Sequence, residues 1–144
     1  MINKLTDHEI EVIGFDADDT LWKNEDLFFE AQNEIKDILK QNSNNFDKEL
    51  LKTEKSNLDI YGYGIKGFIL SIIETSAKNS HEELKIESIN QIIKLGKKML
   101  NAPVNLIEDV EKVLSILSKK YKLILITKGD LLDQERKIKK SKLE

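Results

Sequence analysis

The sequence predicts an α/β fold in which a helical bundle is inserted between two parallel strands. Two short apolar runs, at residues 12–15 and 123–126, both end in polar residues, and the strands predicted from them cover residues 10–15 and 123–126. Continuous apolar runs of this length are typical of strands buried in a parallel sheet. The residues between the two runs have helical periodicity and no strand pattern.

Three carboxylates and a hydroxyl follow the first strand, in the order Asp16, Asp18, Asp19 and Thr20. Carboxylates this close together repel one another, and they lose hydration if they are buried. A divalent cation would offset their charge, and Mg²⁺ prefers one or two carboxylates together with phosphate oxygens. Ligands of open α/β sheets lie beyond the carboxyl ends of the strands, which is where these acids fall. An acidic turn is the alternative, but a turn does not require Asp-x-Asp-x-Thr directly after a buried strand.

Four helices are predicted between the strands, because apolar residues recur there with a period near 3.6. They cover residues 25–41, 47–58, 65–78 and 86–100. Asn24 is the expected N-cap of the first helix, and the only proline, Pro103, marks the end of the fourth. Helices joined by such short connections are typical of a small antiparallel bundle.

After the bundle, apolar residues recur at helical spacing from Ile107 to Leu117, and the second strand follows. That strand leads into Thr127-Lys128-Gly129-Asp130, where a hydroxyl and backbone amides near a helix N-terminus would form an anion site. The alternative is that Asp130 serves only as the N-cap of the last helix, residues 131–142. A lysine-rich helix would suit nucleic acid, but interleaved acids favour a solvent-exposed face. The lysines concerned are Lys128, Lys137, Lys139, Lys140 and Lys142.

The composition is that of a globular protein and excludes several functions. Of the 144 residues, 40% are hydrophobic and 34% are charged. The net charge of −3 and the pI of about 5.6 argue against binding to nucleic acid or to an anionic membrane. Arg136 is the only arginine and cysteine is absent, so neither an arginine cluster nor a thiolate site can form. No apolar run approaches the roughly 20 residues that span a bilayer, and residues 1–9 lack a signal-peptide core, so we expect a cytoplasmic protein.

The first strand with Asp16-Ala17-Asp18-Asp19-Thr20 resembles motif I of the haloacid dehalogenase-like (HAD) superfamily, an apolar strand followed by Asp-x-Asp-x-Thr/Val. The resemblance implies that Asp16 is a nucleophile that becomes an aspartyl phosphate, and that Asp18 is the general acid and base. It also implies Mg²⁺ as cofactor, held by the Asp16 carboxylate and the backbone carbonyl of Asp18. A carboxylate nucleophile is chemically reasonable, because it divides a difficult hydrolysis into two easier steps.

The second strand and the residues after it resemble HAD motif II, in which a hydroxyl and neighbouring amides hold the phosphoryl oxygens. The phosphate-binding groups that this implies are Thr127, Lys128 and the backbone of Asp19. The expected substrate is a small phosphorylated metabolite.

In the HAD subgroup with a helical cap, a bundle inserted between the first two core strands closes over the active site. The resemblance therefore divides the chain into a HAD-like Rossmannoid core, residues 1–23 and 102–144, and an inserted cap, residues 24–101. The loop between the second and third cap helices contributes Tyr63 and Lys66 as candidate substrate contacts. The alternative is an interhelical turn whose tyrosines pack on the helices.

Two motifs of the HAD family are missing from the sequence. A motif III Lys or Arg and a motif IV acidic pair normally lie well beyond motif II, but this sequence ends about 17 residues after Thr127. With only two strands, the first strand would have an unpaired edge and an uncovered apolar face. We therefore expect a truncated HAD phosphohydrolase, an enzyme completed by a second copy or by a complementing C-terminal chain, or a non-catalytic Mg²⁺-phosphate or protein-binding module.

Overall fold

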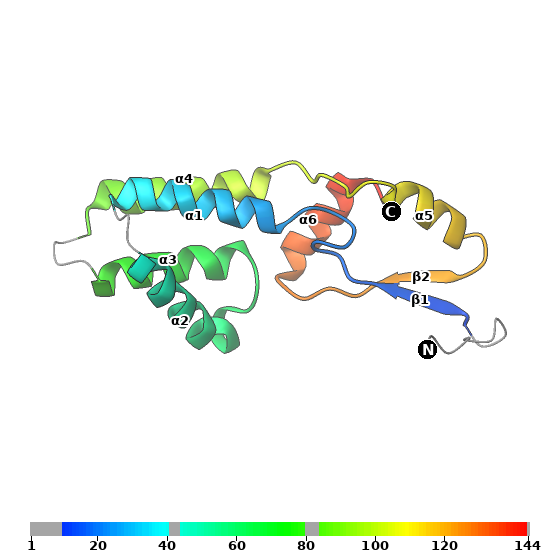
Figure 1. Ribbon diagram of the computed structural model, residues 1–144, viewed down its shortest axis with the longest axis horizontal. Helices are drawn as coiled ribbons and strands as arrows, with labels where there is room; N and C mark the ends of the chain where they lie inside the picture. Colours follow the sequence, from blue (N-terminus) through cyan, green and yellow to red (C-terminus); the bar gives the residue numbers. More distant parts are fainter. Residues whose placement is uncertain (1–9, 41–43, 80–83, 144) are drawn as a thin grey trace.

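The computed structural model of the chain describes residues 10–40, 44–79 and 84–143 (Figure 1). Residues 1–9, in which we expect no signal-peptide core, lie outside these residues. The bounds of the described helices and strands are β1 Val12–Phe15, α1 Glu25–Leu39, α2 Asn44–Tyr61, α3 Ile65–Asn79, α4 Ile86–Asn101, α5 Val110–Leu117, β2 Lys122–Leu125 and α6 Leu131–Ser141.

β1 and β2 form a two-stranded parallel sheet, as predicted. Val12 pairs with Lys122 and Phe15 with Leu125, and the backbone N–H of Ile126 donates to the Phe15 carbonyl at 2.8 Å. The strands contain only the paired residues, so β1 begins two residues later than predicted and β2 lies one residue earlier. The parallel register brings the carboxyl ends of both strands to one edge of the sheet.

The sheet has one covered face and one open face, so the expectation that both strands are buried is wrong. Along each strand, half-buried side chains alternate with exposed ones. On the covered face, Phe15 and Leu125 pack with Leu114 of α5 in one hydrophobic cluster. The open face carries large apolar side chains: Val12 at 46% exposure, Ile124 at 40% and Ile126 at 61%. Within the described ranges, the two-stranded sheet has helix packed against one face only, so this second face is left uncovered.

α1 to α4 form the bundle predicted between the strands (Figure 1). Its core contains Ile35, Ile72 and Ile92, each with 0% exposure. α1, α3 and α4 begin and end within two residues of their predicted bounds. α2 is longer than predicted at both ends, since it begins at Asn44 and continues to Tyr61, and Gly62 with a φ of 69° follows it. None of the described helices is long and apolar enough to cross a membrane.

A second hydrophobic cluster surrounds Trp22, which is 1% exposed. The helical spacing predicts a helix from Ile107, but the backbone N–H of Ile107 donates to the Leu21 carbonyl at 3.0 Å. This pairing keeps the chain extended, and α5 begins only at Val110. α6 lies between the bundle and the sheet in Figure 1, so it can contact both.

Candidate active site

A cavity of about 590 Å³ lies between the bundle and the polar segments that follow β1 and β2. On the sheet side its lining comes from the two strand ends and from α6: Asp16, Asp18, Thr127, Lys128, Asp130, Asp133, Gln134 and Lys137. On the bundle side the lining includes Phe28, Glu54, Asn57, Tyr61, Tyr63, Phe68 and Ser71. The volume is in the range of small-molecule sites.

Asp16 and Thr127 reach this cavity from adjacent strands. Asp16 directly follows β1, and Thr127 lies two residues beyond β2. Because Phe15 and Leu125 are paired in register, both side chains lie at the same end of the sheet. The Asp16 side chain is exposed, and it forms no hydrogen bond or ion pair with any residue that the structure describes. The Thr127 hydroxyl donates to the Lys128 carbonyl at 3.3 Å, which is long for a hydrogen bond from a hydroxyl. Because this bond is weak, the hydroxyl can bind a ligand instead.

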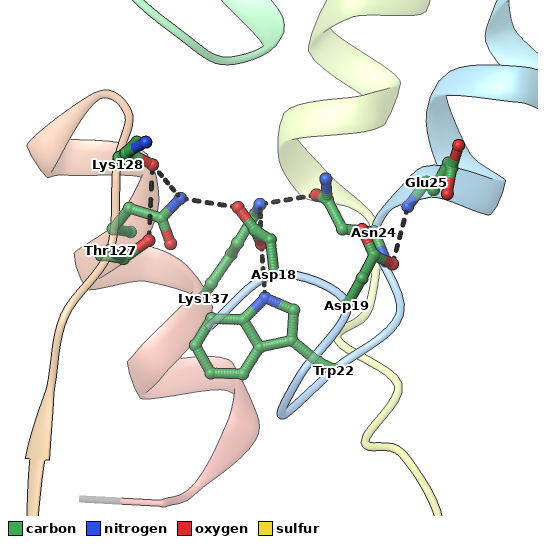
Figure 2. Close-up of polar contacts among 9 residues, drawn as sticks. Asp18, Asp19, Trp22, Asn24, Glu25, Thr127, Lys128 and Lys137 are labelled. Carbon is green, nitrogen blue, oxygen red and sulfur yellow. Dashed lines mark hydrogen bonds and ion pairs between the residues drawn. The ribbon is translucent and has the colours of Figure 1, made fainter. Parts of the chain in front are cut away.

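Asp18 is held in one orientation by three side chains (Figure 2). Its Oδ1 accepts hydrogen bonds from Trp22 Nε1 and Lys137 Nζ, each at 2.7 Å. Its Oδ2 accepts a hydrogen bond from Gln134 Nε2 at 3.0 Å. Burial raises the pKa of Asp18, but the hydrogen bonds from these three side chains outweigh burial and leave the pKa below its usual value. Asp18 is therefore an ionised, oriented carboxylate at neutral pH.

Asp19 serves the start of α1 and does not line the cavity. Its Oδ1 accepts hydrogen bonds from the backbone N–H groups of Asn24 at 2.8 Å and Glu25 at 3.1 Å (Figure 2). Its own backbone N–H donates to the Trp22 carbonyl at 2.8 Å, so the amide expected to bind phosphate is already paired. The structure thus assigns Asp19 to the helix terminus. Asn24 stands at the N-cap position, but its side chain forms no cap bond and instead accepts a hydrogen bond from Lys137 at 2.7 Å.

Lys137 is the cation that pairs with Asp18, and the sequence pattern did not indicate this role. Its side chain is only 18% exposed, so the expectation of a solvent-facing lysine is wrong at this position. It joins α6 to the loop after β1 by bonding both Asp18 and Asn24. One signal could have found it: Gln134 and Lys137 are three positions apart, so they share a face of α6.

Asp130 caps α6, which was the alternative to an anion site here, because its Oδ1 accepts the backbone N–H of Asp133 at 3.1 Å. The same oxygen accepts a hydrogen bond from Lys66 Nζ at 2.8 Å, and Lys66 holds the pKa of Asp130 below its usual value. Lys66 is not among the lining residues, so the structure places it in a contact between α3 and α6. Tyr63 does line the cavity, and Lys128 Nζ lies 6.0 Å from the centre of its ring.

The oxygen atoms at the end of β1 are of the type that Mg²⁺ prefers as ligands. The Asp16 carboxylate and the backbone carbonyl of Asp18 are hard donors, and neither has a partner among the described residues. The side chains of Asp18 and Asp19 are already paired, which corrects the expectation that all three acids need a cation. Within the described ranges, no group of three or more His, Cys, Asp or Glu could hold a metal by itself. Mg²⁺ bound here would keep several waters and share the oxygens of a phosphate ligand.

The chain resembles known hydrolases along almost its whole length. A family model described as haloacid dehalogenase-like hydrolase matches residues 10–144. A haloacid dehalogenase-like family hydrolase from Xanthomonas campestris is 40% identical, with a TM-score of 0.87, over 93% of this chain and 57% of that protein. The HAD hydrolase YfnB from Bacillus subtilis, solved bound to magnesium, is 15% identical, with a TM-score of 0.58, over 93% of this chain and 60% of that protein. No curated protein sequence gives a significant match.

These matches include both strand ends, α6 and the inserted bundle. The likeness to YfnB is one of fold alone, whereas the family model identifies the sequence itself. The chain spans less than two thirds of the length of both solved proteins. The chain belongs to the haloacid dehalogenase-like hydrolase family.

Proposed function

We propose that this chain carries the nucleophile end and the cap of a Mg²⁺-dependent phosphomonoester hydrolase. The proposal is supported by three groups that line one cavity at one end of the sheet: the unpaired Asp16 carboxylate, the oriented Asp18 carboxylate and the Thr127 hydroxyl. In this proposal residues 24–101 are the cap, which closes the far side of the cavity. The substrate is a small phosphorylated metabolite.

In the first step, Asp16 attacks phosphorus in line, and the bond from phosphorus to the leaving oxygen breaks. Asp18 delivers a proton to that oxygen, and the Thr127 hydroxyl donates a hydrogen bond to a phosphoryl oxygen. Mg²⁺, held by the Asp16 carboxylate and the Asp18 backbone carbonyl, would neutralise charge on the phosphoryl group.

In the second step, Asp18 takes a proton from a water molecule, which attacks phosphorus and releases both inorganic phosphate and Asp16. The lowered pKa of Asp18 suits this step, because the carboxylate is ionised in the ligand-free arrangement. The first step requires a protonated Asp18. The negative charge of a bound phosphoryl group raises the pKa of Asp18 and so acts in the required direction.

Attack on carbon, as in haloacid dehalogenases, is the other chemistry of the superfamily. A halide leaves without a proton, so that reaction has no use for an acid beside the nucleophile. The fixed Asp18 carboxylate therefore favours phosphoryl transfer over dehalogenation.

The test is Mg²⁺-dependent hydrolysis of an aryl phosphate by the wild-type chain and by Asp16→Asn. We expect turnover that falls at least about 1,000-fold in Asp16→Asn, since the nucleophile is lost. Asp37→Asn is the matched control, because Asp37 is an exposed carboxylate of α1 outside the cavity lining. Equal rates in the wild type and Asp16→Asn would refute catalysis by the chain alone. Mg²⁺-dependent phosphate binding without turnover would instead favour a non-catalytic binding module.

A second candidate, half of a split enzyme, is favoured by the open apolar face of the sheet. Val12, Ile124 and Ile126 are exposed there, and both solved relatives contain a further portion that this chain does not match. Apolar surface on an unpaired sheet is suited to another polypeptide, either a second copy or a complementing C-terminal chain. The test is to add the unmatched portion of the Xanthomonas protein as a separate chain. Turnover only in the mixture would support the split enzyme, and unchanged rates together with a monomeric mass would refute it.

A further inference from the structure

The bundle side of the cavity contains a carboxylate without a partner. Glu54 of α2 lines the cavity, and its side chain forms no hydrogen bond or ion pair with residues in the described ranges. Burial raises the pKa of Glu54. Glu54 is half-buried, and a partly desolvated carboxylate gains from a hydrogen-bond donor, so a ligand that supplies a donor would be bound more strongly at this position.

Asn57, one helical turn after Glu54, presents a second acceptor. It is 8% exposed, and its Nδ2 donates to Glu74 Oε2 at 2.6 Å and to Ser71 Oγ at 3.3 Å. A carboxylate can only accept, so the contact with Glu74 settles which end of the amide carries the nitrogen. The carbonyl oxygen of Asn57 is therefore the end left to accept a hydrogen bond.

Two further acceptors without donors lie on the α6 side of the same cavity. Asp133 Oδ2 and Gln134 Oε1 are buried, and neither has a hydrogen-bond partner among the residues that the structure describes. Their residues are 5% and 6% exposed. The orientation of the Gln134 amide is determined because its nitrogen donates to Asp18 Oδ2 and, at 3.4 Å, to the Lys128 carbonyl. Buried acceptors of this kind are uncommon in folded proteins unless a water or a ligand satisfies them.

We propose that the cavity wall around Glu54 binds hydroxyl or ammonium groups on the organic part of the phosphomonoester substrate. This inference rests on the proposed function, since the phosphoryl group occupies the end of the cavity near Asp16 and Thr127. The volume of about 590 Å³ leaves room for an organic group beyond the phosphate. Phe28 and Phe68, whose ring centres are 5.1 Å apart, also line the cavity and limit it with apolar surface.

Lys55 provides the opposing argument, because it also lines the cavity and would attract an anionic group. Its side chain is exposed, whereas Glu54 is half-buried. An exposed charge is screened by water and contributes less to binding than a desolvated one. The proposal that this wall binds hydrogen-bond donors therefore rests on Glu54. The test also includes an anionic ligand, which would bind more tightly if Lys55 dominated.

The test measures binding of phosphonates, which cannot be hydrolysed, by isothermal titration calorimetry in Mg²⁺ buffer. Methylphosphonate reports the phosphate end alone. Butylphosphonate, dihydroxybutylphosphonate, aminopropylphosphonate and carboxypropylphosphonate compare apolar, hydroxyl, ammonium and carboxylate groups. The proteins are the wild type, Glu54→Gln and the control Asp59→Asn, which removes an exposed carboxylate of the same helix outside the cavity lining.

We expect the wild type to bind the ammonium or hydroxyl ligand about tenfold more tightly than butylphosphonate, because a hydrogen bond to a charged group typically adds at least this much affinity. Glu54→Gln should lose most of this preference and keep its affinity for methylphosphonate, and Asp59→Asn should match the wild type. A preference that persists in Glu54→Gln, equal affinities for all side groups, or tighter binding of the carboxylate ligand would overturn the inference alone. Failure of the wild type to bind methylphosphonate would overturn the proposed function, and this inference with it.

Discussion

Replacing Lys137 by methionine removes an ammonium group that lies 2.7 Å from both Asp18 Oδ1 and Asn24 Oδ1. Methionine keeps much of the length and apolar volume of the side chain, so the change acts mainly through charge and hydrogen bonding. Asp18 would remain half-buried with only Trp22 and Gln134 as donors.

The expected loss of stability follows from the exposure of the pair. Removing one partner of a fully buried ion pair costs about 3–5 kcal/mol, whereas exposed pairs contribute about 0–1 kcal/mol. The side chains of Lys137 and Asp18 are 18% and 25% exposed, between these limits and closer to the buried one. We therefore expect the free energy of unfolding to fall by about 2–3 kcal/mol at pH 7.

The loss should depend on pH in a defined direction. In the wild type the pKa of folded Asp18 lies below its unfolded value of about 3.9, so the ionised carboxylate adds stability above that pH. This contribution disappears as the pH falls through the folded pKa. In Lys137→Met the folded pKa should rise, because burial is then opposed only by the hydrogen bonds from Trp22 and Gln134. The difference in stability between the two proteins should therefore be largest at pH 7 and shrink toward pH 3.

The assay is urea unfolding followed by the fluorescence of Trp22, the only tryptophan, whose indole N–H bonds Asp18. Lys139→Met is the control, since Lys139 is an exposed lysine of the same helix. An equal free energy of unfolding for Lys137→Met and Lys139→Met at pH 7 would refute the reasoning. So would a deficit that stays constant between pH 7 and pH 3, because the carboxylate would then not be its source.

Two further substitutions test the bundle and its contact with α6. Ile72→Ala, in the bundle core at 0% exposure, should lower the free energy of unfolding by about 2–5 kcal/mol by circular dichroism, while Leu70→Ala, at 46% exposure, should cost less than about 1 kcal/mol. Similar losses at both positions would contradict the described packing. Asp130→Ala should cost about 1–2 kcal/mol because α6 loses its N-cap, whereas Asp130→Asn keeps an acceptor there and should lose only the contribution of the Lys66 pair. Equal losses in the two Asp130 variants would show that the cap contributes nothing.

Local pattern in the sequence was enough to predict the strands, the bundle and one end of the site. The apolar runs before Asp16 and Thr127 predicted two strands, and their parallel pairing brings both residues to the same edge. The positions of the helices followed from apolar periodicity, because this signal acts within one or two turns of chain. Asp130 as an N-cap is a contact of the same local kind.

The tertiary structure alone decided how the charges of the site are paired. Lys137 contacts Asp18 across 119 residues of sequence, and which lysine of α6 faces that loop depends on the rotation of the helix against it. The amide of Asp19 is used by a turn that closes on Trp22, a pairing that depends on the packing of that side chain. Lys66 meets Asp130 because the bundle rests against the start of α6. Residue types and their spacing indicate which groups carry chemistry, but only the packing of distant segments determines which of them face one another.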